Sequence, residues 1–365
     1  MRPTAIPSAG EPRPKALAWR LALITGVAAL IATLAAGPSR AGDLEPRGQW
    51  MVTDSKEAGK LELVLVIGQS GDWSHWNGHT LALDGLKGLT AEQLRGSSTD
   101  VRFVIERDAG TFVCEGRAGG GRGAGLFELQ PARGFAAELA RRGIGRPTES
   151  QQIRLAFADF GYAMLDELQA QRYPVPTVEQ LVTMAEHGVD LAYVRGLAGY
   201  GYRLGSLQAL VRMRDHGVDP SFVRGLSEAG YRGLTIDELL TARDHGVDPR
   251  FVAGLAELGH HGLSMEELIM LRDHGVDPAY IRGMARLGHG DMSLQALRRS
   301  RDHGVDPSYV ADMASAGYHD LAFEDLVRAR DHGVDGRFAR SVSAKAGGRV
   351  PIDRLIAIRD HGGAD

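Results

Sequence analysis

The sequence predicts an α+β fold, in which a small antiparallel β sandwich or partly closed barrel is followed by an α-solenoid of 29-residue helical hairpins. The tripeptide Asp/Glu-His-Gly occurs seven times at a constant step of 29 residues, and short stretches of alternating apolar residues precede it. A constant period of about 20 to 50 residues is typical of one supersecondary unit copied in tandem and stacked on its neighbours. The histidines of the tripeptides are His187, His216, His245, His274, His303, His332 and His361.

Residues 1–41 have the composition of a secretory signal peptide. Basic residues precede an uncharged stretch over residues 21–37, and small residues end the segment at Ala41. We predict cleavage after Ala41 and hence a periplasmic or other extracytoplasmic location. An uncleaved anchor is the alternative, because the apolar stretch is near the lower limit for spanning a bilayer. Cleavage would change the formal net charge from −4 to about −8, which disfavours nucleic acid as a partner.

Residues 43–130 are predicted to form the β module. Residues 60–67 and 101–105 alternate apolar with other positions, which is typical of half-buried strands. Asp108-Ala109-Gly110 predicts a tight hairpin turn, and the glycine-rich residues 116–125 predict a flexible loop in a second hairpin. A phosphate-binding loop is rejected there, because no Gly-Lys-Ser/Thr opens a helix. Residues 89–95 predict one short helix with Thr90 as its cap.

Three side chains of this module are candidates for function. Trp73 and Trp76 lie in a Gly/Ser/Asn-rich segment that predicts a loop, where they could line a small-ligand or carbohydrate groove or simply pack over an open end of the sheet. Cys114 is the only cysteine and alternates with Phe112. It therefore predicts a buried, small apolar residue, with a reactive or intermolecular thiol as the alternative.

Residues 132–365 are predicted to form the solenoid, with two short helices per unit. The first helix of each unit begins after a hydroxyl residue and ends at His-Gly, where glycine adopts the left-handed conformation. The second begins at Asp-Pro, with aspartate as the N-cap and proline in the first turn. The predicted hydroxyl caps are Thr177, Ser206, Thr235, Ser264 and Ser293, and the aspartate caps are Asp219, Asp248, Asp277 and Asp306.

Three columns of residues recur with the repeat: the histidines, a set of arginines, and the aspartates that directly precede the histidines. The histidines are predicted to cap the free carbonyls at the end of each first helix, with pH-dependent tuning as an alternative. A shared metal ion is disfavoured, because stacked helices lie about 8–10 Å apart and two zinc ligands must nearly touch. The second column is either a solvated face or a grip for an acidic or extended partner, and consists of Arg214, Arg243, Arg272, Arg301, Arg330 and Arg359.

The residues resemble a known family. The stretch VRFVIERDAGTFVCEG…GRGAGLFELQP, followed by units of the form LSxxELxxLRDHGVDPxYIRGLxxLGY, is similar to the extracytoplasmic tails of some membrane metallopeptidases related to beta-lactam-sensing regulators, and to stand-alone exported proteins. The resemblance covers roughly residues 48–365. It implies a sensory or interaction part, since the zinc-binding helix motif and the membrane spans of the peptidase are missing. Cys114 stands where the family pattern has an aromatic residue.

The sequence contains no recognised zinc-protease, serine-hydrolase or penicillin-binding signature and indicates no cofactor. We therefore expect a non-enzymatic interaction or sensor protein that binds a protein or peptide partner in the cell envelope, a membrane protein among the candidates. A small-ligand sensor using Trp73 and Trp76 is the second hypothesis, and a hydrolase with an unlisted arrangement the third.

Overall fold

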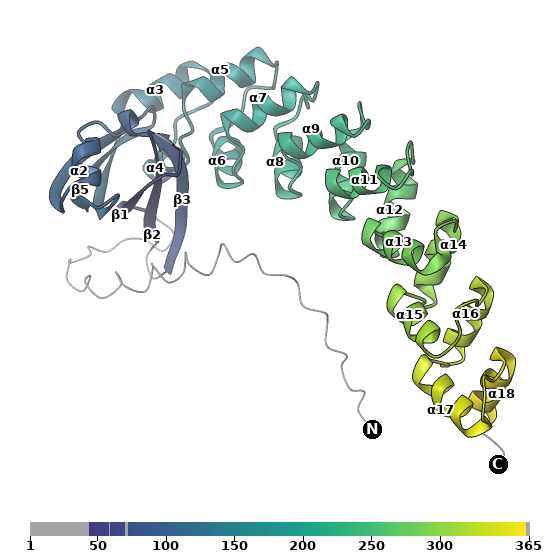
Figure 1. Ribbon diagram of the computed structural model, residues 1–365. Coiled ribbons are helices and arrows are strands. Elements are labelled where there is room, and N and C mark those ends of the chain that lie inside the picture. Colours follow the sequence, from purple (N-terminus) through teal and green to yellow (C-terminus); the bar gives the residue numbers. More distant parts are fainter. Residues whose placement is uncertain (1–43, 58, 70–71, 363–365) are drawn as a thin grey trace, which may run out of the picture.

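The protein is described by a computed structural model that covers residues 44–57, 59–69 and 72–362. A single curled antiparallel sheet, a half-barrel, is followed by a curved row of helices that runs to the C-terminal end (Figure 1). The α+β class is therefore confirmed. The predicted signal peptide, residues 1–41, lies outside the described residues. Within those residues no helix is long and apolar enough to cross a membrane.

The sheet has the strand order β3-β2-β1-β6-β5-β4, with every neighbouring pair antiparallel. Of the two predicted forms, the partly closed barrel agrees with the structure and the sandwich does not, because these strands form one sheet whose curl lets its inner face bury a core by itself. The strands are β1 Leu44–Asp54, β2 Lys60–Gln69, β3 Asp72–Ala82, β4 Thr99–Arg107, β5 Gly110–Gly119 and β6 Arg122–Pro131.

The inner face of the sheet holds an aromatic core. Trp50 and Phe103 meet edge to face at 4.8 Å between ring centroids, and Phe112 and Phe127 do so at 5.2 Å. Cys114 is fully buried beside them, so the prediction of a small apolar residue is confirmed. Burial raises the pKa of its thiol to about 12, because the thiolate would lose its hydration.

The glycines of residues 116–125 make space for a tryptophan. A Cβ at Gly116 would lie 2.8 Å from the Trp50 ring, and one at Gly123 would lie 3.0 Å from it. The predicted flexible loop is therefore wrong: β5 and β6 continue through these residues, and only Gly120 and Gly121 form the turn, both with positive φ. The predicted turn between β4 and β5 and the short helix α2 (Ala91–Arg95), capped by Thr90, are confirmed.

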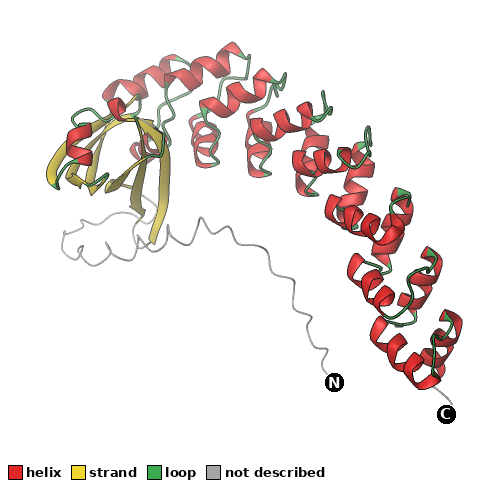
Figure 2. Cartoon of the chain, in the orientation of Figure 1, coloured by secondary structure: helices red, strands yellow, loops and turns green. Residues whose placement is uncertain are grey.

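Short turns join the helices that follow the sheet (Figure 2). Pro131 ends β6, and α3 begins at Arg133. The helices are α3 Arg133–Arg141, α4 Glu149–Phe157, α5 Tyr162–Ala170, α6 Val178–Glu186, α7 Leu191–Gly199, α8 Leu207–Asp215, α9 Pro220–Glu228, α10 Ile236–Asp244, α11 Pro249–Ala256, α12 Met265–Asp273, α13 Pro278–Met284, α14 Leu294–Asp302, α15 Pro307–Ser315, α16 Phe323–Asp331, α17 Gly336–Ala346 and α18 Ile352–His361. The π-helical turn η3 (Ala285–His289) extends α13.

The predicted helix caps are confirmed. The side chains of Thr177, Ser206, Thr235, Ser264 and Ser293 accept a hydrogen bond from a backbone N–H in the first turn of α6, α8, α10, α12 and α14. The carboxylates of Asp219, Asp248, Asp277 and Asp306 do the same for α9, α11, α13 and α15. Each of these odd-numbered helices has proline at its first position, where no backbone N–H is needed.

The sheet and the helices share one packed junction. The Arg107 side chain, 4% exposed, donates to the carbonyl oxygens of Ala156 and Phe157 at 2.8 and 2.7 Å, at the end of α4. The buried Gln152 side chain of α4 donates to the carbonyls of Ala109 and Ala132, each at 2.8 Å. Because α4 also contacts β1, β5 and β6, the row of helices is fixed directly on the sheet.

Candidate interaction surface

The histidines bridge successive even-numbered helices. Each imidazole Nδ1 lies 2.5–2.8 Å from the carboxylate that ends the next even-numbered helix. A carboxylate only accepts, so Nδ1 carries the proton and donates it. The pairs are His187–Asp215, His216–Asp244, His245–Asp273, His274–Asp302, His303–Asp331 and His332–Asp360.

The prediction that these histidines cap their own helices is wrong. After α8, the backbone N–H of Gly217 donates to Arg214 O at 3.0 Å, and that of Val218 donates to Met213 O at 2.9 Å. The left-handed glycine (φ 70) allows this closure, which occupies the carbonyls that the imidazole was expected to bind. The side chain is therefore free to reach the next helix.

The arginine column lies against aromatic rings. Each guanidinium stands over a ring of the preceding odd-numbered helix, at 4.8–5.2 Å from its centroid, which is a cation–π geometry. To reach the ring it passes the glycine that ends an earlier helix; a Cβ at Gly217, for example, would lie 3.2 Å from Arg243 Nε. The pairs are Arg214–Tyr193, Arg243–Phe222, Arg272–Phe251, Arg301–Tyr280, Arg330–Tyr309 and Arg359–Phe338. These six arginines are called the arginine row below.

The arginine row keeps its hydrogen-bond donors available. Among the described residues, no Asp or Glu forms an ion pair with any of the six guanidinium groups, although ion pairs are frequent elsewhere in the helices. Five of the six are exposed, and Arg214 is half-buried. The ring and the glycine beside Nε hold each guanidinium in place, and a held, exposed guanidinium is suited to binding carboxylates.

The Asp caps and tyrosines beneath the row are held by local hydrogen bonds. Burial alone would raise the pKa of Asp219, but hydrogen bonds from Ser221 and from the Phe222 N–H outweigh it and hold the pKa below the usual value. Burial raises the pKa of Tyr193, whose hydroxyl donates to Val218 O at 3.0 Å. The same hydrogen bonds that cap α9 therefore favour the ionised form of Asp219.

The odd-numbered helices approach one another closely through glycine and proline. A Cβ at these glycines would lie only 2.4–2.7 Å from the proline Cγ of the next odd-numbered helix. The pairs are Gly196–Pro220, Gly225–Pro249, Gly254–Pro278 and Gly283–Pro307. At the next contact Asp312 replaces the glycine and Gly336 replaces the proline. There, the Gly336 N–H and the Arg340 guanidinium donate to the Asp312 carboxylate at 2.8 and 3.0 Å.

Trp73 and Trp76 lie in a strand, so the predicted loop is wrong. Both belong to β3, the edge strand of the sheet, where Trp76 is the register partner of Val66. Pairing with the strongly apolar β2 outweighs the Gly/Ser/Asn composition of this segment, because tryptophan and histidine fit a pleated strand. The side chains of the two tryptophans lie outside the described residues, and the structure does not bring these positions to the arginine row (Figure 1).

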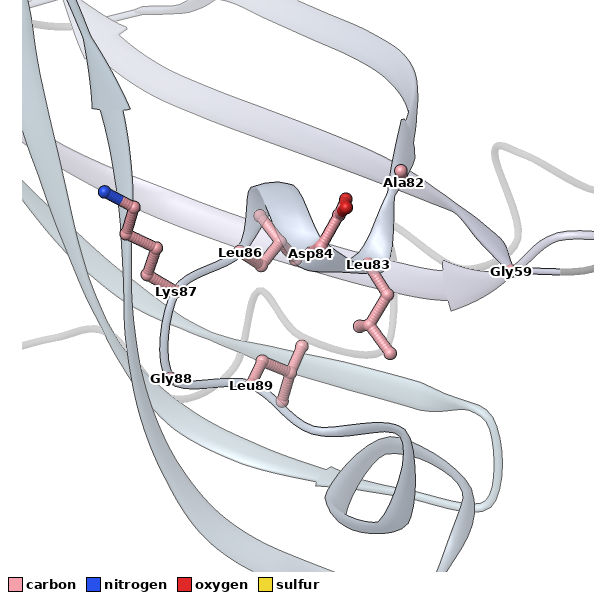
Figure 3. A pocket seen from close by; sticks show the side chains of 8 residues that line it. All are labelled: Gly59, Ala82, Leu83, Asp84, Leu86, Lys87, Gly88 and Leu89. Carbon is pink, nitrogen blue, oxygen red and sulfur yellow. The ribbon is translucent and has the colours of Figure 1, made fainter.

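Two hollows are present in the described surface. The first, about 560 Å³, is lined by Leu83, Leu86 and Leu89 together with Asp84 and Lys87, and neither tryptophan takes part (Figure 3). Lys87 is already paired with Glu106. The second, about 310 Å³, lies between α6 and α8 and is lined by apolar side chains next to Asp215 and His216. Its lining includes Arg212 but not Arg214, the row residue that precedes Asp215 in the sequence.

Comparison with known proteins adds no assignment. The chain matches no family model, no curated protein and no solved structure. Within the described residues, no group of three or more His, Cys, Asp or Glu side chains could hold a metal ion. Sequence reasoning saw the arginines, histidines and aspartates as separate columns and missed their contacts. Each His and its Asp partner are 28 residues apart, one less than the period, and this spacing was the signal in the sequence that could have revealed the His–Asp pairs.

Proposed function

We propose that this protein is an exported, non-enzymatic interaction protein whose helices form a solenoid of 29-residue hairpins that binds a protein or peptide partner in the cell envelope. The even-numbered helices begin at residues 178, 207, 236, 265, 294, 323 and 352, which supports equal units. The observation that carries the proposal is the arginine row: oriented, exposed cations without an acidic partner in the described part of the chain.

The working surface is the exposed side of the even-numbered helices, with the row at their C-terminal ends. Arg-Asp-His triplets recur there. In each triplet the aspartate pairs with a histidine of the preceding unit and the arginine stacks on a ring of the preceding helix, and five of the six arginines are exposed. Stacked units of this kind present extended surfaces suited to extended partners. The basic N-terminal residues and the uncharged stretch after them support export.

Site-specific photo-cross-linking in cells tests this proposal. A photoreactive amino acid is placed at Gln208 or Thr241 on the helices and, as matched controls, at Glu62 or Arg117 on the outer face of the sheet; all four positions are exposed. We expect one discrete cross-linked species from the helix positions and none from the sheet. Cross-links from the sheet alone, or none from any position, would contradict the proposal.

A further inference from the structure

We propose that the arginine row binds an acidic peptide segment in the polyproline II conformation, with a carboxylate at every third residue. This inference rests on the proposed function and specifies the partner of the same surface. It starts from the six guanidinium groups, which recur once per unit over their rings.

The spacing of the row favours this conformation. Successive even-numbered helices are in contact, as α6 is with α8 and α10 with α12, and the axes of packed helices lie about 8–10 Å apart. We take this interval as the step from one arginine of the row to the next. A polyproline II helix has three residues per turn and rises about 9.3 Å per turn, so every third side chain points the same way at that interval. A β-strand repeats each face after about 6.6–6.8 Å, which does not match the row.

The charge of the surface favours separate carboxylates over a dense polyanion. Each arginine of the row is followed in sequence by an aspartate that is paired with a histidine, such as Asp244 with His216, and Asp302 also lies 3.9 Å from Arg298. Cations and anions therefore alternate along the surface, and the whole chain has a formal net charge of −4. A nucleic acid or polyphosphate chain carries a charge every few ångströms and would meet these aspartates. An acidic peptide with two uncharged residues between successive carboxylates would not place a negative charge beside these aspartates.

The hollow between α6 and α8 suits the residues between the carboxylates. Asp215 and His216, which follow Arg214 in the sequence, line it, and Met184, Leu207 and Val211 supply its apolar lining. Proline is the residue that best maintains polyproline II, and its ring is apolar. A peptide with prolines between its acids would thus place rings against this lining and carboxylates at the arginine edges.

Binding of synthetic peptides to the full chain, measured by fluorescence anisotropy, tests the inference. The probe is a labelled peptide of consecutive Glu-Pro-Pro units. The comparison peptide has the same composition, with alternating Glu-Pro units and the remaining prolines at its end. Both peptides favour polyproline II and need little ordering on binding, so they differ only in the spacing of their carboxylates. Because only the first has a carboxylate at every third residue, we expect it to bind at least about tenfold more tightly than the second.

Two variants with equal loss of charge locate the site. Arg243→Gln, Arg272→Gln and Arg301→Gln together remove half of the row, and we expect about tenfold weaker binding. Arg232→Gln, Arg250→Gln and Arg282→Gln together change exposed arginines outside the row, and we expect a change of less than about twofold. If the first variant does not fold, the three Arg→Lys substitutions keep the charge and lose the planar group, so a clear weakening is still expected.

Equal binding of the two peptides would overturn the claim that carboxylates at every third residue match the interval between the arginines. Binding of linear polyphosphate without binding of either peptide would overturn the peptide assignment in favour of a polyanion. If neither probe binds while Gln208 and Thr241 still give a discrete cross-link in cells, the inference fails and the proposed function stands. Peptide binding without any cellular cross-link from the helices would support the chemistry of the row and refute the proposed function.

Discussion

Asp312 and Gly336 form a pair that we predict can be exchanged only together. At four other contacts between odd-numbered helices the same positions hold glycine and proline. The Asp312 carboxylate here accepts from the Gly336 N–H, which a proline could not offer. Arg340 donates to the same carboxylate. A second contact follows the same rule, because Glu167 replaces the glycine, Leu191 the proline, and Arg195 donates to Glu167 at 2.6 Å.

The magnitudes follow from these contacts. Asp312→Gly removes the carboxylate that accepts from the Gly336 N–H and from Arg340, which keeps only its 3.4 Å contact with the backbone carbonyl of residue 312. The change also introduces a helix-interior glycine, and we expect a loss of about 2 kcal/mol. Gly336→Pro removes the N–H and places ring atoms near Asp312, since even a Cβ would lie 2.5 Å from its Cγ, a loss of about 3–4 kcal/mol. In the double variant a modest outward shift of α17 restores the glycine–proline spacing, so we expect a loss of at most about 2 kcal/mol and a coupling energy of about 3–4 kcal/mol.

Native-state hydrogen exchange of the α17 amides measures these values, because it reports the free energy of local opening. The matched control is the reverse exchange, Gly254→Asp with Pro278→Gly, in which Arg282 stands where Arg340 stands in the natural pair. We expect each single change there to cost more than the double. Additive losses in both cycles, with a coupling energy below about 0.5 kcal/mol, would refute the reasoning.

Three further predictions follow from single contacts. Gly225→Ala places a Cβ 2.4 Å from Pro249 Cγ and is expected to lower the free energy of unfolding by about 1–3 kcal/mol. The control Gly199→Ala, whose Cβ would have no atom within 4 Å, should be neutral or slightly stabilising. Equal effects of the two substitutions in urea denaturation would contradict this prediction. Arg107→Met removes the buried guanidinium that donates to two carbonyls at the end of α4 and should cost about 2–4 kcal/mol. The exposed Arg117→Met should cost less than about 0.5 kcal/mol, and a tolerated Arg107→Met would show that the junction does not depend on this side chain. Hydrogen bonds from the Thr235 and Ser264 backbone N–H and hydroxyl groups lower the pKa of Glu238 and Glu267 below 4.5. The stabilisation from these two carboxylates is therefore present above the unfolded pKa and is lost as the pH falls through the lowered folded pKa. Thermal denaturation from about pH 6 to pH 3 should show a smaller loss of stability for the Glu238→Gln, Glu267→Gln variant, which keeps both capping boxes, and identical pH profiles would exclude the effect.

Features that depend on neighbours along the chain could be predicted from the sequence. Each cap needs only a residue type and a position three residues away, so Thr235 and Asp248 were assigned correctly from local chemistry. The left-handed glycines after each histidine follow from the same local rule.

Contacts between units were outside the reach of such rules. The partner of His216 depends on the direction in which the imidazole leaves the helix end, and the backbone closure by Gly217 and Val218 decides that direction. Likewise the glycines of residues 116–125 were interpreted as a loop, because their purpose is to accommodate Trp50, which lies 66 residues before Gly116. The sequence showed the six arginines as a regular column, but it did not show that each one stacks on the aromatic ring of the preceding odd-numbered helix.

Deletion of one whole unit tests most directly that the helices are equal, stacked hairpins. Removing residues 236–264 joins Thr235 to Met265, so His216 would meet Asp273 and Arg272 would stand over Phe222, in the geometry of the present pairs. We predict a cooperatively folded protein with the same helical circular dichroism per residue and protected amides in α8 and α12. Removing residues 236–257 instead breaks the phase and should unfold the segment. Loss of folding on the in-phase deletion, or equal tolerance of both deletions, would contradict the account.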